Sequence, residues 1–191
     1  AAAYPNANAY VSKLDVSGNF AWAKSFDGPY DDEGVSIYLD NSGNVYTVGY
    51  FQDSADFDPG SGTFNLYCSG SSEGYLSKLD SLGNFVFAKQ IGVGSFMAYA
   101  FSTILDSSEN ILISGAFYGT ADFDPGAGVF NLTASASNDA FVLKLDSLGD
   151  FLWAKNFGGG SSGTTATSIS LDTTGNVYIT GISIGIGTFF D

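Results

Sequence analysis

The chain repeats its own sequence at a period of about 66 residues. A first block occurs three times, as SKLDVSGNFAWAK at 12–24, SKLDSLGNFVFAK at 77–89 and LKLDSLGDFLWAK at 143–155. A second block occurs three times, as LDNSGNVY at 39–46, LDSSENIL at 105–112 and LDTTGNVY at 171–178, and ADFDPG occurs at 55–60 and 121–126. Self-similarity at a fixed spacing of this kind predicts a repeat architecture, in which each unit buries its apolar surface against its neighbours.

Both longer blocks contain a signal for a tight hairpin. An Asp stands at the first position of each expected turn and a Gly at the fourth, where a positive φ favours glycine. The segments after the second-block turns are apolar at successive positions, which is typical of strands buried on both faces. One copy departs from the pattern, because Glu109 occupies the glycine position. That turn is expected to be strained or of another type.

Two hairpins per repeat predict four antiparallel strands, and no segment has helical periodicity. Four-stranded units of about 40 to 50 residues are typical of β-propeller blades, so the longer repeat leaves room for an insertion. The sequence therefore predicts an all-β fold, with 1–191 forming one β-propeller segment of two full blades and two half blades. We place a half blade at 10–26, blades at 34–91 and 99–157, and a half blade at 166–183. A β-solenoid is the competing fold, but its coils usually repeat at shorter spacing and lack paired hairpin turns.

The segments DEGVSIYLDNSGNVYTVGY at 32–50 and TSISLDTTGNVYITG at 167–181 resemble the SBBP repeat, which is named for seven-bladed β-propellers. The resemblance covers nearly the whole chain and concerns the scaffold. It implies a large bacterial protein, secreted or attached to the cell surface, of a kind often exported by type IX secretion. An extracellular or cell-surface location is therefore expected. The family supplies no catalytic residues to carry over.

Composition narrows the function. The chain has no His and no Arg, and its formal net charge is -14. Its cations are six lysines, all in the first block, so we interpret them as parts of the scaffold. Without His there is no imidazole base, no Ser-His or Cys-His pair and no zinc cluster of the usual kind. An acidic chain without Arg is also a poor partner for nucleic acid or anionic membranes. The expected partners are proteins or neutral glycans.

Carboxylates alone offer one further route to catalysis. Two acids can cleave a glycosidic bond when they are suitably spaced. The Asp-x-x-Gly-x-x-x-Trp pattern of the first block is loosely similar to structural motifs of quinoprotein and sialidase propellers, but those enzymes need arginines to hold their ligands. Since the paired acids are repeated, they fit a single active site poorly. The sequence therefore predicts that the protein is not an enzyme.

A single cysteine, Cys68, rules out a disulfide within the chain, and no apolar run is long enough to span a membrane. Membrane insertion is not expected. If the terminal half blades paired with each other, the ring would hold three blades, below the usual four to eight. We therefore expect further blades of the same polypeptide or self-association of copies to close the ring.

Antiparallel order puts the tight turns on one side of the fold and the variable segments on the other. These segments are the loops 27–33, 92–97 and 158–165 and the insertions 52–74 and 118–138. Binding on a repeat scaffold usually collects on the side that carries variable loops. We expect binding on this side, which we call the loop face.

Two kinds of residue on the loop face are candidates for a site. Repeated carboxylates in the insertions could supply the oxygen ligands that Ca²⁺ prefers, or could simply begin Pro-Gly turns while the intervening phenylalanines enter the core. The candidate calcium ligands are Asp56, Asp58, Asp122 and Asp124. The acidic run 31–33 is interpreted as a solvated loop. No cofactor is required, and calcium is the one that the sequence suggests.

Aromatic rings are the second kind of candidate, because exposed tyrosines beside acids commonly hold neutral sugars. Most aromatic residues of the chain fall at repeated strand positions, however, where core packing is the simpler explanation. The candidate binding residues are Tyr30, Tyr50, Tyr67, Tyr99 and Tyr118. The leading hypothesis is a non-catalytic binding or adhesion scaffold. The alternatives are a structural spacer within a larger secreted protein and, less favoured, a calcium-dependent propeller that binds or processes glycans.

Overall fold

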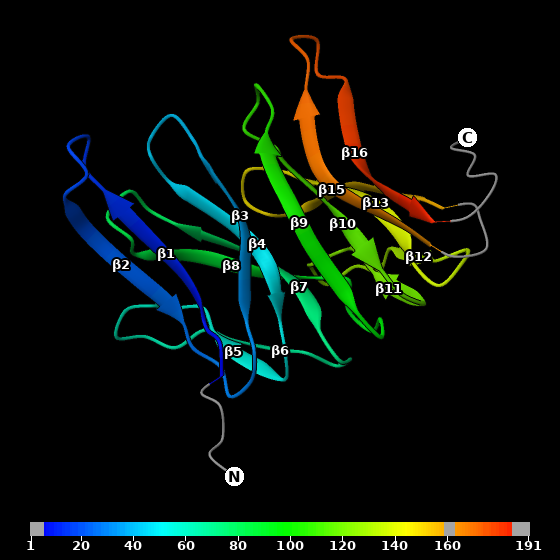
Figure 1. Ribbon diagram of the computed structural model, residues 1–191, viewed down its shortest axis with the longest axis horizontal. Helices are drawn as coiled ribbons and strands as arrows, with labels where there is room; N and C mark the ends of the chain where they lie inside the picture. The colour runs from blue at the N-terminus through cyan, green and yellow to red at the C-terminus, as the bar shows by residue number, and fades with distance from the viewer. Residues whose placement is uncertain (1–5, 159–162, 185–191) are drawn as a thin grey trace.

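A computed structural model of the chain describes residues 6–158 and 163–184, and the regular elements of these residues are all β-strands (Figure 1). Two antiparallel sheets have four strands each. The first complete sheet has the order β3 (Glu33–Leu39), β4 (Val45–Phe51), β7 (Glu73–Leu79), β8 (Phe85–Ile91). The second complete sheet has the order β9 (Ala98–Leu105), β10 (Ile111–Phe117), β13 (Asp139–Leu145), β14 (Phe151–Phe157). The predicted all-β fold with four-stranded antiparallel sheets is confirmed.

A two-stranded sheet lies at each end of the described chain. The N-terminal half-sheet pairs β1 (Ala9–Leu14) with β2 (Phe20–Phe26), and the C-terminal half-sheet pairs β15 (Gly163–Leu171) with β16 (Val177–Ile184). Figure 1 shows them at opposite ends of the molecule. By repeat position, β1 and β2 match the third and fourth strands of a complete sheet, whereas β15 and β16 match the first and second.

Each hairpin of the repeated blocks is closed by its own Asp. In the turn after β1, the Asp15 carbonyl accepts a hydrogen bond from Gly18 N–H at 3.0 Å, and the Asp15 carboxylate accepts from the N–H groups of Ser17 and Asn19 at 2.8 and 2.9 Å. Asn19 also donates its side-chain amide to the same carboxylate. Equivalent bonds from the backbone hold the turns that begin at Asp40, Asp80, Asp106, Asp146 and Asp172.

Glu109 forms the same turn as the glycines it replaces. Its N–H donates to the Asp106 carbonyl at 3.0 Å, and its φ is 62°, in the left-handed region that Gly18 and its equivalents also occupy. Of the two expectations for this position, a turn of another type is therefore wrong. The backbone strain is real, because a side chain with a Cβ pays a conformational cost at positive φ.

The insertions contain short hairpins that the sequence patterns did not predict. One pairs β5 (Ser54–Asp56) with β6 (Asn65–Tyr67), and the other pairs β11 (Thr120–Asp122) with β12 (Asn131–Thr133). Backbone bonds join each insertion to the preceding loop between sheets, from Asp27 to Asp56 and from Val93 to Asp122. The insertions are therefore ordered parts of the loop face.

Three apolar cores hold the sheets together face to face. One lies between the N-terminal half-sheet and the first complete sheet and includes Phe26 and Tyr75. A second lies between the two complete sheets and includes Val48 and Ile111. The third lies between the second complete sheet and the C-terminal half-sheet and includes Ile169. The middle strands β4 and β10 are buried along nearly their whole length, as strands covered on both faces must be.

The two sides of this stack differ as predicted. The turns that join β1 to β2, β3 to β4, β9 to β10 and β15 to β16 lie together at the upper edge of Figure 1. The opposite side carries the loops 27–33 and 92–97 and the two insertion hairpins, whereas residues 159–162 of the predicted loop 158–165 lie outside the described residues. We refer to these as the turn face and the loop face below.

Replacing Glu109 with Gly should stabilise the protein by about 1 kcal/mol, because it relieves the positive-φ cost of a residue with a Cβ. Urea unfolding monitored by circular dichroism measures the free energy of unfolding. Gly175→Glu is the matched control: Gly175 has φ 89° and a Cβ there would meet no atom within 4 Å, so only backbone strain changes. The control should lose stability by a similar amount. An equal stability of Glu109→Gly and the parent chain would contradict the argument.

Candidate binding face

The carboxylates of the first insertion bind the backbone of their own loop. One Asp56 oxygen accepts hydrogen bonds from the N–H groups of Asp58 at 3.0 Å and Phe64 at 2.8 Å. One Asp58 oxygen accepts from Gly60 N–H at 2.8 Å. Charged acceptors of this kind form strong hydrogen bonds, so the two acids fix the turn that joins β5 to β6.

The second insertion repeats the arrangement. Asp122 accepts from the N–H groups of Asp124 and Phe130, and Asp124 accepts from Gly126 N–H. The phenylalanine between the acids enters the core in each copy: Phe57 packs on Tyr75 with ring centroids 4.7 Å apart, and Phe123 packs on Phe141 at 4.8 Å. Over residues 6–158 and 163–184, no group of three or more metal-binding side chains comes together. The geometry favours the turn interpretation, and the calcium hypothesis stays a prediction.

The acidic loop before β3 differs from its prediction as a solvated segment. Asp31 and Glu33 are exposed, but Asp32 is only 2% exposed. One Asp32 oxygen accepts from Gln52 N–H at 3.2 Å, while the other has no hydrogen-bond partner in the structure. Burial raises the Asp32 pKa to about 6, assisted by the nearby negative charges of Asp31 and Asp27. The Asp32 carboxylate packs closely against the chain at Gly28, where an added Cβ would meet Asp32 Oδ2.

The five candidate tyrosines do not form one group. Tyr30, in the loop before β3, and Tyr67, on β6, are exposed singly at 54% and 66%. Tyr118 follows β10 and is half-buried, and its N–H donates to the Met97 carbonyl at 2.9 Å. Tyr50 on β4 and Tyr99 on β9 come together, with ring centroids 4.7 Å apart and planes at 81°.

Tyr50 and Tyr99 are the centre of what we call the inner aromatic cluster, which also includes Phe101, Met97 and Glu33. The Tyr99 ring stacks on Phe101 at 5.9 Å, and the Tyr99 hydroxyl donates to Met97 Sδ at 3.1 Å. Burial, followed by a hydrogen bond to Glu33, raises the Tyr50 pKa to about 12. Both tyrosines are half-buried. The cluster thus offers ring surface, two hydroxyls and one exposed carboxylate at the loop-face ends of β3, β4 and β9.

Sequence reasoning missed Met97 and Phe101, which no motif marks, and it missed a repeated buried acid. Glu73 is fully buried and accepts from Ser69 and Gly94 N–H, and it also bonds Gln90. Asp139, one repeat later, accepts from Ser135 and Asn156. The sequence did contain a signal for these buried acids, because an acid recurs at the repeat spacing at the start of a strand. Both acids join the end of an insertion to an outer strand.

Two further features of the described residues bear on chemistry. The lone Cys68 is half-buried, and burial raises the pKa of its thiol, so it is a weak nucleophile at neutral pH. No helix in the described part of the chain is long and apolar enough to cross a membrane.

Comparison with known proteins supports the repeat architecture. No protein-family model matches the chain. An uncharacterized WD repeat-containing protein of Acanthamoeba polyphaga mimivirus is 28% identical over 197 residues, an alignment that covers 88% of this chain and 14% of the relative. The chain is therefore distantly homologous to a protein of β-propeller repeats, and it spans about one seventh of that relative's length. Four-stranded sheets stacked face to face are the blades of such a fold.

Substitutions at Asp122 separate the turn role from a calcium role. Asp122→Ala removes the acceptor of two backbone N–H groups and should lower the free energy of unfolding by about 2 kcal/mol. Asp122→Asn keeps a carbonyl oxygen at that place and should lose much less. Thermal unfolding with EDTA or with 5 mM Ca²⁺ should give the same ranking. A melting temperature that Ca²⁺ raises in the parent chain but not in Asp122→Asn would show a calcium site instead.

Asp32→Asn should stabilise the protein at pH 8 by about 1 kcal/mol or more. The folded-state pKa of Asp32 is about 6 against an ordinary value of 3.8, so the buried carboxylate lowers stability above about pH 6, and this cost fades as the pH falls toward 4. Urea unfolding at pH 8 and at pH 5 should therefore show a smaller advantage of the variant at pH 5. Asp31→Asn removes the same charge from an exposed neighbour and should lack this dependence on pH.

Proposed function

We propose that this chain is a non-catalytic binding scaffold that holds a neutral glycan or a protein surface at its loop face. The observation that carries the proposal is the inner aromatic cluster, in which Tyr50, Tyr99 and Phe101 gather beside Glu33. Ring faces pack on the apolar faces of sugars or side chains. At the edge of the rings the tyrosine hydroxyls donate or accept hydrogen bonds, and the carboxylate accepts them.

The negative charge of the chain restricts the kinds of ligand that it can bind. The chain has a formal net charge of -14, no Arg and no His, so anionic ligands would be repelled and would find no guanidinium to bind. Two of the lysines contact side chains of the sheets: Lys144 bridges to Asp106 at 2.7 Å, and Lys78 lies over the Tyr46 ring at 4.7 Å. A neutral ligand with many hydroxyls, or a protein patch without strong negative charge, fits this surface.

The proposed location is outside the cell or on a bacterial cell surface. The SBBP-like pattern at 32–50 and 167–181 supports it, because proteins with such repeats are typically large and secreted, often by type IX secretion. Adhesion is the role that follows for a binding scaffold displayed there.

A structural spacer within a larger secreted protein is the second candidate function. It is favoured by the regular turn face and by the small share of the relative, 14%, that the chain matches. A spacer needs ordered sheets but no ligand at the loop face. The two functions therefore differ in whether the inner aromatic cluster binds anything.

Removing rings from the cluster should weaken binding without unfolding the protein. Cellohexaose, xylohexaose and mannohexaose serve as neutral probes in isothermal titration calorimetry. Tyr50→Ala and Tyr99→Ala should each weaken binding of the preferred probe about fivefold to tenfold, the value of one aromatic contact. Tyr38→Ala is the control, because Tyr38 is a half-buried tyrosine near the turn-face end of β3.

Circular dichroism establishes that each tyrosine variant keeps the parent melting behaviour. Unchanged affinity in both cluster variants would exclude the cluster as the site. If none of the probes binds at millimolar concentration, the neutral-glycan assignment is wrong, and a protein partner or the spacer function takes its place.

A further inference from the structure

Second-strand positions that are buried in the complete sheets are exposed in the C-terminal half-sheet. Tyr46 and Leu112 are 0% and 1% exposed on β4 and β10, whereas Tyr178, at the same repeat position on β16, is 58% exposed. Nearly every residue of β16 is exposed, while β4 and β10 are almost completely buried. In a complete sheet the second strand has a third strand at its edge and packed neighbours on its faces, whereas no described strand lies at the free edge of β16.

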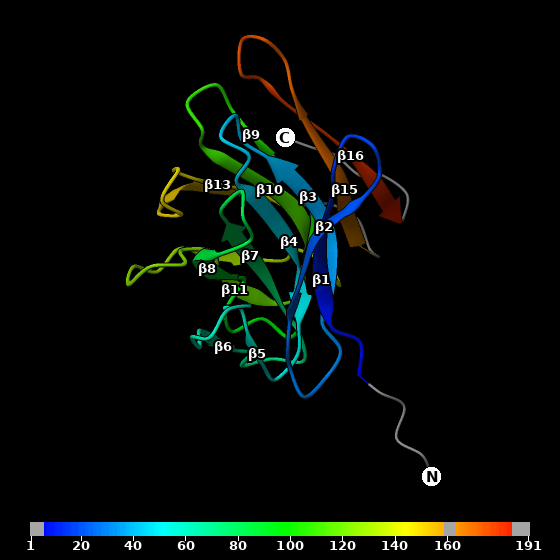
Figure 2. The same cartoon turned by 90° about the vertical axis from the view of Figure 1, so that its left-hand side faces the viewer.

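In the N-terminal half-sheet, the exposed position belongs to the third strand of the repeat. Tyr75 on β7 and Phe141 on β13 are fully buried, whereas Tyr10, at the same repeat position on β1, is 71% exposed. Figure 2 looks onto this half-sheet, with β1 and β2 in front of the first complete sheet. The edge of β1 that would pair with a second strand has no strand beside it among the described residues. The two ends thus carry complementary halves of the same four-stranded sheet.

We propose that two copies of this chain associate head to tail, with β16 of one copy pairing antiparallel with β1 of the other. The complete sheets fix the register. Val45 pairs with Leu79 and Gly49 with Tyr75 in the first, and Ile111 pairs with Leu145 and Gly115 with Phe141 in the second. The same repeat positions place Val177 opposite Leu14, Ile179 opposite Ser12 and Gly181 opposite Tyr10.

In this register the exposed Tyr10 ring would pack against the other copy. In both complete sheets the third-strand aromatic lies over a glycine of the second strand: a Cβ on Gly49 would be 3.0 Å from Tyr75, and one on Gly115 would be 2.7 Å from Phe141. Gly181 is the glycine at this position on β16. The Tyr10 ring of one copy therefore covers Gly181 of the other.

Charge is also complementary across the junction. Lys78 lies over the ring of Tyr46, its cross-strand neighbour, and Lys144 forms an ion pair with Asp106. Lys13 is the equivalent lysine on β1, and Asp172 and Tyr178 are the equivalent partners at β16. The Tyr178 hydroxyl already donates to Asp172 at 3.2 Å, as Tyr46 does to Asp40. Lys13 now donates to the Ser81 carbonyl and would turn from it toward the other copy.

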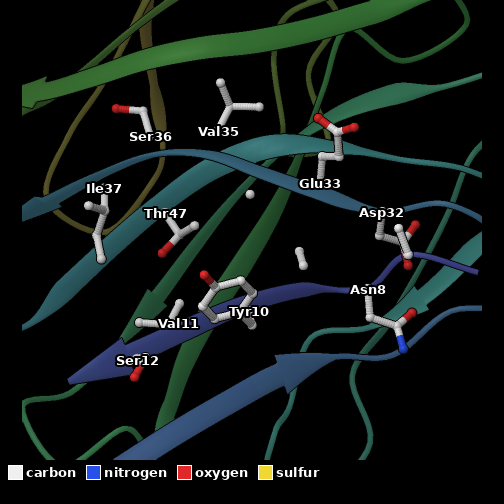
Figure 3. Close-up of a pocket in the computed structure, with 13 residues that line it drawn as sticks. Asn8, Tyr10, Val11, Ser12, Asp32, Glu33, Val35, Ser36, Ile37 and Thr47 are labelled. Atoms are coloured by element: carbon white, nitrogen blue, oxygen red, sulfur yellow. The ribbon is translucent and has the colours of Figure 1, made fainter. Parts of the chain in front are cut away.

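A groove lies beside each half-sheet. One groove of about 540 Å³ runs between β1 and β3, lined by Tyr10, Val11, Val35, Ile37 and Thr47 (Figure 3). The other, of about 530 Å³, lies beside β16 against β13 and β14, lined by Val142, Trp153 and Ile179. The first accepts the other copy's C-terminal half-sheet, and the second accepts its N-terminal half-sheet.

Closure of both junctions makes a ring. The half-sheets of one copy lie at opposite ends of the molecule (Figure 1) and do not pair with each other, so the proposed ring closes through the second copy. Two copies contribute two complete sheets each and share one completed sheet at each junction, which gives six sheets. Propellers usually have about four to eight.

The mass of the 191-residue chain in solution tests the closed ring. Sedimentation equilibrium from 1 to 200 µM should show two chains per particle. Tyr10→Asp should weaken this association at least tenfold, whereas Tyr67→Asp, which changes an equally exposed tyrosine on the loop face, should leave it intact. A monomer at every concentration overturns the proposal and assigns the half-sheets to further repeats of a longer polypeptide. A series of ever larger species overturns the closed ring.

Disulfide trapping tests which strands pair. In a Cys68→Ala background, Ser12→Cys and Ile179→Cys chains are prepared separately, and each should stay uncrosslinked under mild oxidation. Mixing the two should give a covalent dimer. Mixing Ser12→Cys with Thr180→Cys, one residue out of register, should give much less. Crosslinking of either single variant with itself would mean that like edges pair, which overturns the head-to-tail arrangement.

Discussion

The fold depends on sheets that are apolar on both faces. The middle strands β4 and β10 have no face that can be left in water, so each sheet needs a neighbour on both sides. The insertions follow the same constraint. Phe57 and Phe123 leave their loops to join the cores, where they pack on Tyr75 and Phe141. Core packing thus orders the loop face. The candidate binding residues Tyr50 and Tyr99 lie on the strands of the packed sheets.

Sequence predicted the features whose causes are local. An Asp-capped turn involves five consecutive residues, so its pattern is visible in every copy, and even Glu109 keeps the geometry because Asp106 supplies the same bonds. The insertion hairpins were missed for the opposite reason. The carboxylate of Asp56 accepts a hydrogen bond from the N–H of Phe64, eight residues away across a Pro-Gly turn. The segment also lacks the alternation of apolar residues that indicates strands.

The sequence predicted on which side of the fold the candidate site lies, but not which residues come together there. Antiparallel order places all five tyrosines near the loop face, yet only the stacking of one complete sheet on the next brings Tyr50 to Tyr99. Asp32 was misjudged because a run of acids usually marks a solvated loop. Its burial depends on bonds to Ala7 and Gln52, residues that belong to other segments of the chain.

The proposed binding site and the proposed junctions between copies use different surfaces of this molecule. The inner aromatic cluster lies on β3, β4 and β9 of the complete sheets, whereas the proposed junctions lie at the half-sheets. Copies with a formal net charge of -14 repel one another, so the proposed association would rely on apolar strand edges and on Lys13 lying opposite Asp172. A closed ring would hold one cluster from each copy in a fixed geometry. Two weak sites held in this way bind a repeating ligand far more tightly than either alone, because the second contact is made at a high effective concentration.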